Sequence, residues 1–598
     1  MKSRVESAAC RRAQSLALLP VARLVGALFL LNLGTPAVAQ PDAGTLLNQE
    51  QRSQQRLPNR LPEAQSPSTP PALKDTGGAR VVVKSVRFTG ALELASEPVL
   101  QALVAPSIGK ELDFAELEKL ARSVTSFLRS KGWMLAQAYL PKQDVTEGYI
   151  EIAVRAGRLD GSNGQGEPFV LVPGGKKPLR MDTARLKAIA AARLPAGAVV
   201  NEAELERAML LMNDLPGISA RARLEPGSEA DSSRVTVDVE EGPLLTSSLG
   251  LDGYGNRDTG MVQLGFSAQL NDLSGMGDQA SANATHSEGL DLVRLGYTLP
   301  AGRQGLKLGA SWSGMQYQIR NGTGLAAGLK GESDTTGLTL SYPLLRSRSN
   351  NVYATLGFTH KALKDESLVG VLRDKRVNVW NAALSGDALD TRGGGGLTAW
   401  NAGLTTGQLN LDGVPADAAA DAAGYDAQGH FDKLNYGFSR LQKLPGAFTA
   451  FASVSGQAAG KNLDSSEKFL LGGPNGVRAY PGSEGSGDTG WLANFEVRYD
   501  LPGSTSLGQM QVFGFYDTGH ISLHNDPKNI AIATASGQNS YGLAGWGLGG
   551  TLSKSGSHLV RLVWARKIGN NPASTTSGLD ADGQADTSRI WLQATLWF

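Results

Sequence analysis

The chain is poor in the residues that support several common kinds of site. Its 598 residues include one cysteine and six histidines, and the formal net charge is only +1. Cys10 lies in a segment that we expect to be removed, so the mature chain should contain no disulfide. The histidines lack the spacing of metal ligands, and no basic run indicates nucleic-acid binding. We therefore expect no metal, no cofactor and no nucleic-acid partner.

Long apolar runs are also missing, apart from one near the N-terminus. Four cations precede an apolar segment over residues 16–33, and small residues at 37–39 end it. This pattern is typical of a secretory signal peptide, which we predict over residues 1–39, with cleavage after Ala39. An anchor helix is the weaker alternative, because Pro20 interrupts the run. No later segment approaches about 18 consecutive apolar residues, so any membrane role would require a β-barrel.

Two short segments follow the predicted signal peptide. Residues 40–57 have the pattern of a short, mostly polar helix. Residues 58–79 are rich in Pro, Ser and Gly, which is the composition of a linker. The exported chain should therefore begin with a helix on a flexible tether.

The next part of the chain predicts two copies of one small α/β domain. Residues 80–157 have the order β-α-α-β-β, and Asp113 with Glu116 predicts a capping box at the second helix. The same plan returns over residues 158–243, although its first strand is weakly marked. The apolar residues of the helix after Asp113 recur at helical spacing, and they are Phe114, Leu117, Ala121, Val124 and Leu128.

After Pro243 the helical period disappears and alternating strand patterns take its place. Segments of about ten residues are separated by turns, and counting them predicts sixteen strands over residues 244–598. Short turns alternate with longer loops, as in outer-membrane barrels, whereas a soluble β-sandwich or propeller is the rival interpretation. The longer loops are predicted near 318–333, 363–376, 409–427, 460–489, 519–539 and 570–587.

Two details favour the membrane barrel over the soluble alternatives. Tyr297, Tyr342 and Tyr499 stand beside short turns, where an aromatic girdle is expected. The chain ends "RIWLQATLWF", which places apolar residues from Ile590 to Phe598 on one face of a last strand. We therefore predict an all-β, 16-stranded antiparallel transmembrane barrel, preceded by two small α/β domains and an N-terminal helix.

One glycine-rich stretch, "GGPNGVRAYPGSEGSGDTG", carries a single cation, Arg478. By strand parity, Glu496 of the twelfth strand and Phe513, Phe515 and Asp517 of the thirteenth face the lumen. The loop is long enough to fold back inside, so we expect Arg478 to pair with Asp517, with Glu496 as an alternative acceptor. The competing interpretations are a solvated loop cation and a phosphate-binding loop. The second lacks the strand and helix that such a loop needs.

The order of segments resembles the TpsB transporters of two-partner secretion, which are FhaC- and ShlB-like and belong to the BamA superfamily. The sharpest resemblances are "GVRAYPG", similar to the family's V-R-G-Y/F pattern in loop 6, and "FYDTG", similar to its F-x-D-x-G pattern in strand 13. Ala479 departs from the family, which usually has Gly there. The matching residues are Val477, Arg478 and Tyr480 in the loop, and Phe515, Asp517 and Gly519 in the strand.

The resemblance implies a function and a location. The α/β domains would be periplasmic POTRA domains, POTRA 1 over 80–157 and a ShlB-type POTRA 2 over 158–243, and residues 40–57 would be a pore plug. The barrel would sit in the outer membrane and secrete an unfolded exoprotein of the haemolysin or filamentous-haemagglutinin (TpsA) type by type Vb secretion. The implied partners are this exoprotein, outer-membrane lipids, and, during biogenesis, periplasmic chaperones and the barrel assembly machinery.

Other functions are less well supported by the residues. A BamA- or TamA-like assembly factor usually has more POTRA domains and no plug, and a plain porin needs no POTRA domain. An outer-membrane enzyme would need a catalytic cluster, and no Ser-His-Asp set stands out. "DADGQAD", with Asp580, Asp582 and Asp586, has only part of a calcium-loop spacing, so we expect an acidic surface loop. We therefore predict a transporter that is not an enzyme.

Overall fold

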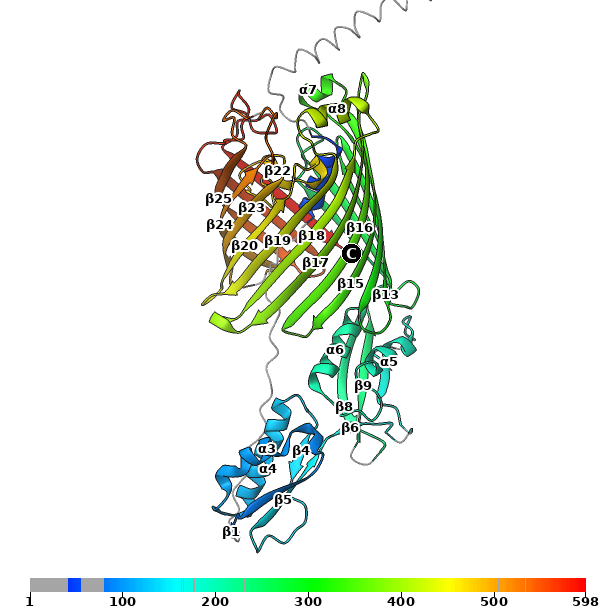
Figure 1. The fold of residues 1–598 in the computed structure, drawn as a ribbon, viewed down its shortest axis with the longest axis vertical. Helices are drawn as coiled ribbons and strands as arrows, with labels where there is room; N and C mark the ends of the chain where they lie inside the picture. The colour runs from blue at the N-terminus through cyan, green and yellow to red at the C-terminus, as the bar shows by residue number, and fades with distance from the viewer. Residues whose placement is uncertain are drawn as a thin grey trace, which may run out of the picture.

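The computed structural model describes residues 41–54 and 80–598, except 163, 165, 176, 177, 230, 231, 504 and 533. The predicted signal peptide and linker lie outside the described residues. Figure 1 shows two small α/β domains below a large barrel, with one helix inside the barrel. Within the described residues, no helix has the length and apolar composition needed to cross a membrane.

The first α/β domain is a three-stranded sheet covered by two helices. In its sheet, β5 is central and pairs in parallel with β2 and antiparallel with β4. The predicted capping box is present at α4, where Asp113 accepts from the Glu116 amide at 2.8 Å and its own amide donates to Glu116 at 2.9 Å. The elements are β1 (Val81–Val82), β2 (Ser85–Gly90), η2 (Leu92–Leu94), α3 (Glu97–Val104), η3 (Ala105–Ser107), β3 (Glu111–Leu112), α4 (Phe114–Ser130), β4 (Gln137–Tyr139) and β5 (Tyr149–Arg155).

The second α/β domain repeats this plan around a central strand, β9. This strand pairs in parallel with β6 and β7 on one side and antiparallel with β8 on the other. Helix α5 ends at Ala191, and the following residues form a turn. The elements are β6 (Arg158–Leu159), β7 (Phe169–Pro173), α5 (Thr183–Ala191), α6 (Glu202–Asn213), β8 (Ile218–Pro226) and β9 (Ser232–Glu241).

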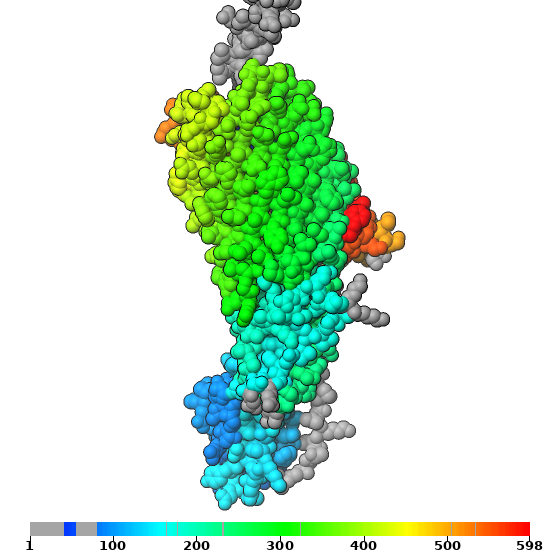
Figure 2. All heavy atoms as spheres, turned by 90° about the vertical axis from the view of Figure 1, so that its right-hand side faces the viewer, coloured from blue at the N-terminus to red at the C-terminus, as the bar shows by residue number. Residues whose placement is uncertain are grey.

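The second domain is attached directly to one rim of the barrel, which we call the near rim; the opposite rim is the far rim. Arg346 forms a two-pronged contact with the Asp214 carboxylate, at 2.9 and 2.8 Å. Arg207 donates to the carbonyl of Pro343 at 2.8 Å, and Lys307 donates to the carbonyl of Asp214 at 3.0 Å. Figure 2 shows the second domain against the barrel and the first domain beyond it.

The barrel is closed and has sixteen strands, as predicted. The last strand, β27, pairs antiparallel with the first, β10, and this pairing closes the wall. The strands are β10 (Leu245–Asp252), β11 (Gln263–Asn271), β12 (Gln279–Ser287), β13 (Leu290–Ala301), β14 (Leu306–Gln318), β15 (Lys330–Arg346), β16 (Asn350–Ser367), β17 (Gly370–Asp390), β18 (Gly396–Asn410), β19 (Gly429–Lys443), β20 (Phe448–Ala459), β23 (Thr489–Asp500), β24 (Gln509–Ser522), β25 (Ser540–Lys554), β26 (His558–Lys567) and β27 (Ser588–Trp597).

One predicted loop, 363–376, is instead the tip of a β-hairpin. β16 continues to Ser367 and β17 starts at Gly370, so only two residues form the turn. The prediction was wrong because charged residues in this segment resemble a loop. Successive side chains, however, point alternately into and out of the barrel, as in a strand. Asp365 and Lys375 are each only 3% exposed. With 21 residues, β17 is about twice as long as a membrane-crossing strand needs to be.

Most of the short elements lie in the loops of the far rim and inside the lumen, whereas η4 lies in the turn between β17 and β18, at the rim next to the second α/β domain. The lumen helix α2 spans Ala43–Ser53 and begins three residues after the predicted start, because Asp42 forms its N-cap by accepting from the Thr45 amide at 2.8 Å. The others are α7 (Gly322–Ala326), η4 (Arg392–Gly394), α8 (Pro415–Ala423), η5 (Ser465–Glu467), β21 (Phe469–Leu470) and β22 (Ser486–Gly487).

Candidate functional site in the barrel lumen

The loop between β20 and β23, residues 460–488, folds into the barrel. We call it loop 6. Its tip is fully buried, with Val477, Ala479 and Tyr480 each 0% exposed. These side chains share an apolar cluster with lumen-facing residues of β24 and β27, such as Phe515 and Trp591. The loop tip is therefore held by packing as well as by its charge.

Arg478, at the loop tip, binds two carboxylates at once. Its Nε and Nη2 donate to the two oxygens of Asp517 at 2.8 and 2.7 Å, and its Nη1 donates to Glu496 at 2.5 Å. The backbone amide of Arg478 also donates to Asp517, at 3.1 Å. The arginine is 3% exposed. Glu496 is thus a simultaneous second partner of Arg478, not an alternative to Asp517.

Neighbouring side chains complete this polar cluster. Arg498 donates to the second oxygen of Glu496 at 2.8 Å, and Asn494 donates to Asp517 at 2.8 Å. Asn494 also donates to the carbonyl of Gly476, at 3.1 Å, which ties the wall to the loop backbone. The buried charges are therefore paired and hydrogen-bonded, as low-dielectric surroundings require.

The two lumen-facing phenylalanines of β24 serve as platforms for cations. The guanidinium carbon of Arg478 lies 3.5 Å from the centre of the Phe515 ring, and that of Arg561 lies 4.6 Å from the Phe513 ring. Cation–π attraction is strengthened when the groups are desolvated. Phe515 thus helps to hold the loop cation, and Phe513 holds a wall cation of β26 beside it.

The backbone of Ala479 and the glycines that face the loop explain why the loop tip tolerates an alanine at this position. Ala479 needs no left-handed backbone, because among the described residues a positive φ at a non-glycine occurs only at Asp272, Asp426 and Asn529. Its methyl group faces Gly545 of β25, where an added Cβ would lie 2.6 Å from it. At Gly519 an added Cβ would overlap Leu471 of loop 6. Glycines in the wall therefore make room for the loop.

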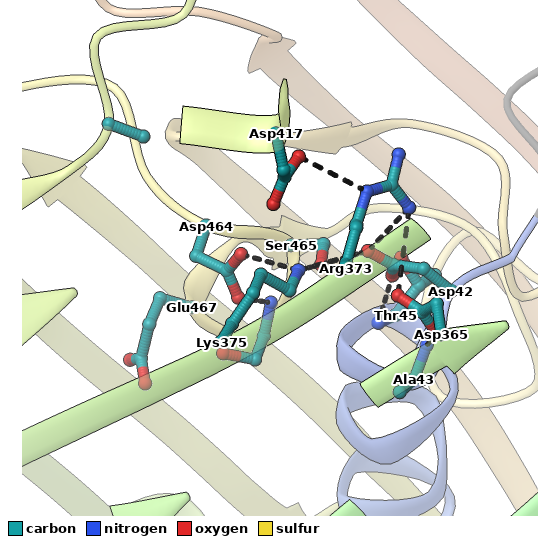
Figure 3. A network of polar contacts seen from close by, with 12 residues as sticks. Asp42, Ala43, Thr45, Asp365, Arg373, Lys375, Asp417, Asp464, Ser465 and Glu467 are labelled. Carbon is teal, nitrogen blue, oxygen red and sulfur yellow. Dashed lines mark hydrogen bonds and ion pairs between the residues drawn. The ribbon is translucent and has the colours of Figure 1, made fainter. Parts of the chain in front are cut away.

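Helix α2 lies in the lumen beside loop 6, and its N-terminal end sits in a second polar cluster (Figure 3). The Asp42 carboxylate accepts from Ser465 Oγ at 2.7 Å and from Lys375 Nζ at 3.2 Å. Lys375 also binds Asp464 of loop 6, at 2.7 Å. Arg373 lies within 3.5 Å of Asp42. The helix start is therefore held jointly by β17 and loop 6.

Loop 6 also contacts the rest of the helix. Asn48 donates to the carbonyl of Lys468 at 2.7 Å, and Asn475 donates to the carbonyl of Arg52 at 2.9 Å. On the other side, Glu50 accepts from Gln263 of β11 at 2.6 Å. The helix and loop 6 thus form one connected insert in the lumen.

The base of loop 6 is held by lysines of the wall. Lys361 of β16 and Lys433 of β19 both bind Glu467, at 2.7 and 2.8 Å. Sequence reasoning missed Lys361, Lys375 and Lys433 as functional residues. The usable signal was the period of two in the charged segments, which continues beyond the length that a membrane strand needs.

Two of the three aspartates of the predicted acidic surface loop near the C-terminus are buried, whereas Asp586 is exposed as predicted. Asp580 is 2% exposed and Asp582 is 9% exposed. Lys567 and Arg589, which lie on the adjacent strands β26 and β27, pair with Asp580 at 2.5 and 3.2 Å. The prediction was wrong for Asp580 and Asp582, because the loop folds back onto the wall strands that flank it and brings these carboxylates to their cations. The carboxylates neutralise wall cations.

Glu484 of loop 6 joins that C-terminal loop. Its carboxylate accepts from Asn571 and from the amide of Ala581, each at 2.7 Å. Burial raises the pKa of Glu484 to about 7, against the lowering effect of these two donors. Glu484 therefore gains or loses its proton near neutral pH, and the charge at this contact changes with it.

Comparison with known proteins places the chain among secretion transporters. A family model described as haemolysin secretion/activation protein ShlB/FhaC/HecB matches residues 231–552, and one for the ShlB-type POTRA domain matches residues 81–157. The heme/hemopexin transporter protein HuxB of Haemophilus influenzae is 26% identical over 596 residues, covering 96% of this chain and 97% of that protein. The outer membrane transporter CdiB of Dickeya dadantii is 24% identical, covering 77% and 80%.

Solved structures agree on the fold. CdiB from Escherichia coli has a TM-score of 0.70 at 20% identity, covering 94% of this chain and all (100%) of that one. CdiB from Acinetobacter baumannii has a TM-score of 0.62 at 18% identity. Since the ShlB/FhaC/HecB model matches more than half of the chain, this protein belongs to that family: it is a two-partner secretion transporter, with its barrel in the outer membrane and its POTRA domains in the periplasm.

Proposed function

We propose that this transporter exports one large exoprotein of the TpsA type through its lumen, which α2 closes at rest and loop 6 organises. The observation that carries the proposal is how α2 is held. The barrel ladder is complete without it, and it is attached by separate polar contacts such as those of Asp42 and Glu50. Such a helix can withdraw while the wall stays intact. The predicted linker, residues 58–79, lies between it and the periplasmic domains in the sequence.

Loop 6 is proposed to stay in place through Arg478 and to shape the export path. Removing the guanidinium would leave Asp517 and Glu496 buried next to each other without their shared cation, which typically costs about 3–5 kcal/mol. The sixteen-strand ladder does not depend on this contact. Loss of Arg478 should therefore damage export and spare insertion of the barrel.

The experiment that tests this role compares Arg478→Ala with wild type in a secreting strain. Exoprotein in the medium should fall about tenfold or more, while the heat-modifiable, membrane-inserted barrel remains. Arg478→Lys should rescue poorly, because an ammonium cannot reproduce the planar fork. Arg440→Ala is the matched control: Arg440 pairs with Asp390 in the wall, away from loop 6, and should secrete normally. Wild-type secretion by Arg478→Ala would exclude the proposal.

A charge swap adds specificity to this test. Exchanging Arg478 for Asp and Asp517 for Arg should restore part of the secretion lost by either change alone. Because Glu496 also contacts Arg478, the swap belongs in a Glu496→Gln background, where the new carboxylate meets no second anion. Recovery in that background supports the direct pair, and equal loss in all three variants argues against it.

The periplasmic domains are proposed to capture the unfolded exoprotein as an added β-strand. In POTRA 2, β9 is central and unavailable, whereas β8 pairs with β9 over nine residues and, among the described strands, with no other. We infer that β8 offers the main edge for the exoprotein. A neighbouring gene that encodes a large secreted protein would supply the exoprotein for this test. For its own biogenesis the transporter would require outer-membrane lipids, periplasmic chaperones and the barrel assembly machinery.

A further inference from the structure

The surface of the wall that holds α2 has the features of a peptide-binding site. We call this surface the plug socket. Its apolar part belongs to the same buried cluster as Ala43, Leu46 and Leu47 of the helix. Among the wall residues of the cluster are Leu292, Tyr317, Leu363, Val377, Leu409 and Phe431, each 6% exposed or less.

The socket continues into the parts of β16 and β17 that exceed the length of a membrane-crossing strand. Leu363 and Val377 face the lumen in this extension and are 1% and 0% exposed. Figure 1 shows α2 in the half of the barrel far from the POTRA domains. A chain that enters from the periplasm therefore meets the socket just before it leaves the barrel.

The polar end of the socket selects a carboxylate at one position. Lys375 is 3% exposed and contacts Asp42 and Asp464, and Ser465 donates to Asp42. Next to this point the space is narrow, because a Cβ added at Gly44 would overlap Ser465 of loop 6. The socket thus fits a carboxylate, then two small residues and a threonine, then an apolar pair that begins four positions after the carboxylate.

Withdrawal of α2 would leave this surface bare in water. The apolar wall residues would be solvated, and Lys375 would lose one of its two carboxylates. Both changes oppose withdrawal. A passing segment with the same chemistry removes this opposition by taking the place of the helix.

We propose that the plug socket is a binding site for the exoprotein, and that α2 is its resident ligand. During export the socket would take exoprotein segments with a carboxylate followed at the fourth position by paired apolar side chains, as in Asp42, Leu46 and Leu47. This inference rests on the proposed export function, since it assumes that α2 leaves. It adds the chemical class of segment that the lumen recognises.

The first test uses the full chain without residues 41–54, inserted in planar bilayers, with its fold checked by heat-modifiability. The probe is the synthetic peptide of residues 41–54, "PDAGTLLNQEQRSQ". Added on the extracellular side, it should reduce the conductance. The same peptide with Asp42→Asn should block roughly tenfold less well, because a charged hydrogen-bonded contact is lost. Peptides with Leu46→Ser and Leu47→Ser, or with Gly44→Val, should not block.

The matched change in the socket is Lys375→Gln. In that barrel the advantage of the native peptide over the Asp42→Asn peptide should shrink severalfold, since Lys375, the nearer of the two cations at Asp42, is gone and only Arg373 remains. Equal block by both peptides in the unaltered socket, or no block by either, would overturn the inference. Neither result depends on secretion, so they leave the proposed function untouched.

The second test places a photo-crosslinker at Val377 in secreting cells. Illumination during export should join the secreted exoprotein to position 377, whereas a crosslinker at Leu404, which is 66% exposed on the outer face of β18, should not capture it. Capture at β8 without capture at 377 would show export that bypasses the socket, which contradicts the inference. No secretion by the parent chain would contradict the proposed function instead.

Discussion

At the scale of single residues, the fit between loop 6 and the wall depends on small side chains. Ala479 packs against Gly545, and the two positions should therefore be coupled. Gly545→Ala would put two methyl carbons 2.6 Å apart and displace the loop tip, at a cost of about 1–3 kcal/mol. We expect secretion to fall severalfold in an inserted barrel.

Two further variants sharpen this prediction. Ala479→Gly in the Gly545→Ala background should restore secretion, because it removes the opposing methyl group. Gly550→Ala in the same strand should have little effect, because its added Cβ would meet its nearest neighbour at 3.9 Å. A Gly545→Ala variant that secretes normally would show that the loop tip is less tightly packed than this contact implies.

A second residue-scale prediction concerns the pH dependence of Glu484. Burial raises its pKa from an ordinary 4.5 to about 7, so folding favours the protonated carboxyl. The stabilisation is fully present below about pH 4.5 and is lost as the pH rises through 7, by up to about 1.4 kcal/mol per pH unit. Asp580 nearby acts in the same direction as burial, and Lys567 opposes it.

Hydrogen exchange of residues 568–587, the loop that Glu484 contacts, measures this effect. Protection corrected for intrinsic rates should decrease between pH 5.5 and 8 in the wild type. In Glu484→Gln it should stay constant, because the amide does not titrate and still offers one acceptor. Identical pH profiles in the two proteins would rule out Glu484 as the titrating group.

At the scale of elements, β8 is the strand proposed to receive the exoprotein, and its alternation provides an internal control. In an antiparallel strand, consecutive residues direct their N–H groups to opposite sides. Of Ala222→Pro and Arg223→Pro, one therefore removes a bond to β9 and the other removes an outward donor. The outward variant should keep the domain folded and weaken exoprotein binding about tenfold, measured with the isolated exoprotein N-terminal region.

Deletion of both POTRA domains tests whether exoprotein capture depends on them at all. A chain without residues 80–243 should not secrete, although its barrel can still insert. If both proline variants of β8 bind the exoprotein normally while the deletion abolishes binding, capture uses a different edge, such as β7.

At the scale of the whole molecule, loop 6 and α2 are one insert, so changes at distant points should be coupled. Deleting residues 40–57 should raise the single-channel conductance, because the helix occupies the lumen. Arg478→Ala should raise it as well, since Asn475 and Ser465 of the loosened loop hold the helix. Combining both changes should add less than the sum of the two.

Additive effects would show that loop 6 and α2 move independently. Unchanged conductance after the deletion would mean that α2 does not close the pore. Arg440 of β19 offers a control, because it pairs with Asp390 within the wall, outside the insert: Arg440→Ala should leave the conductance unaltered in either background.

Local patterns in the sequence determined much of this architecture. The period of two is a property of the extended backbone, so strand parity alone predicts that Glu496 and Asp517 face inward. The sixteen strands, the capping box at Asp113 and the repeated α/β plan depend on similarly short-range rules. The meeting of Arg478 with Asp517 could be anticipated because parity and loop length both pointed to it.

The tertiary structure alone decided which oppositely charged groups, far apart in the sequence, form ion pairs. Nothing near Lys375 in the chain indicates that it binds Asp42 and Asp464, and the charged tip of β16 and β17 resembles a loop until the helix packs against it. Glu496 is a second partner of Arg478 because the pairing of β23 with β24 sets both carboxylates beside the point where the loop tip enters the lumen. These contacts join residues far apart in sequence, so they depend on how the wall closes and what fills it, and local periodicity carries no information about either.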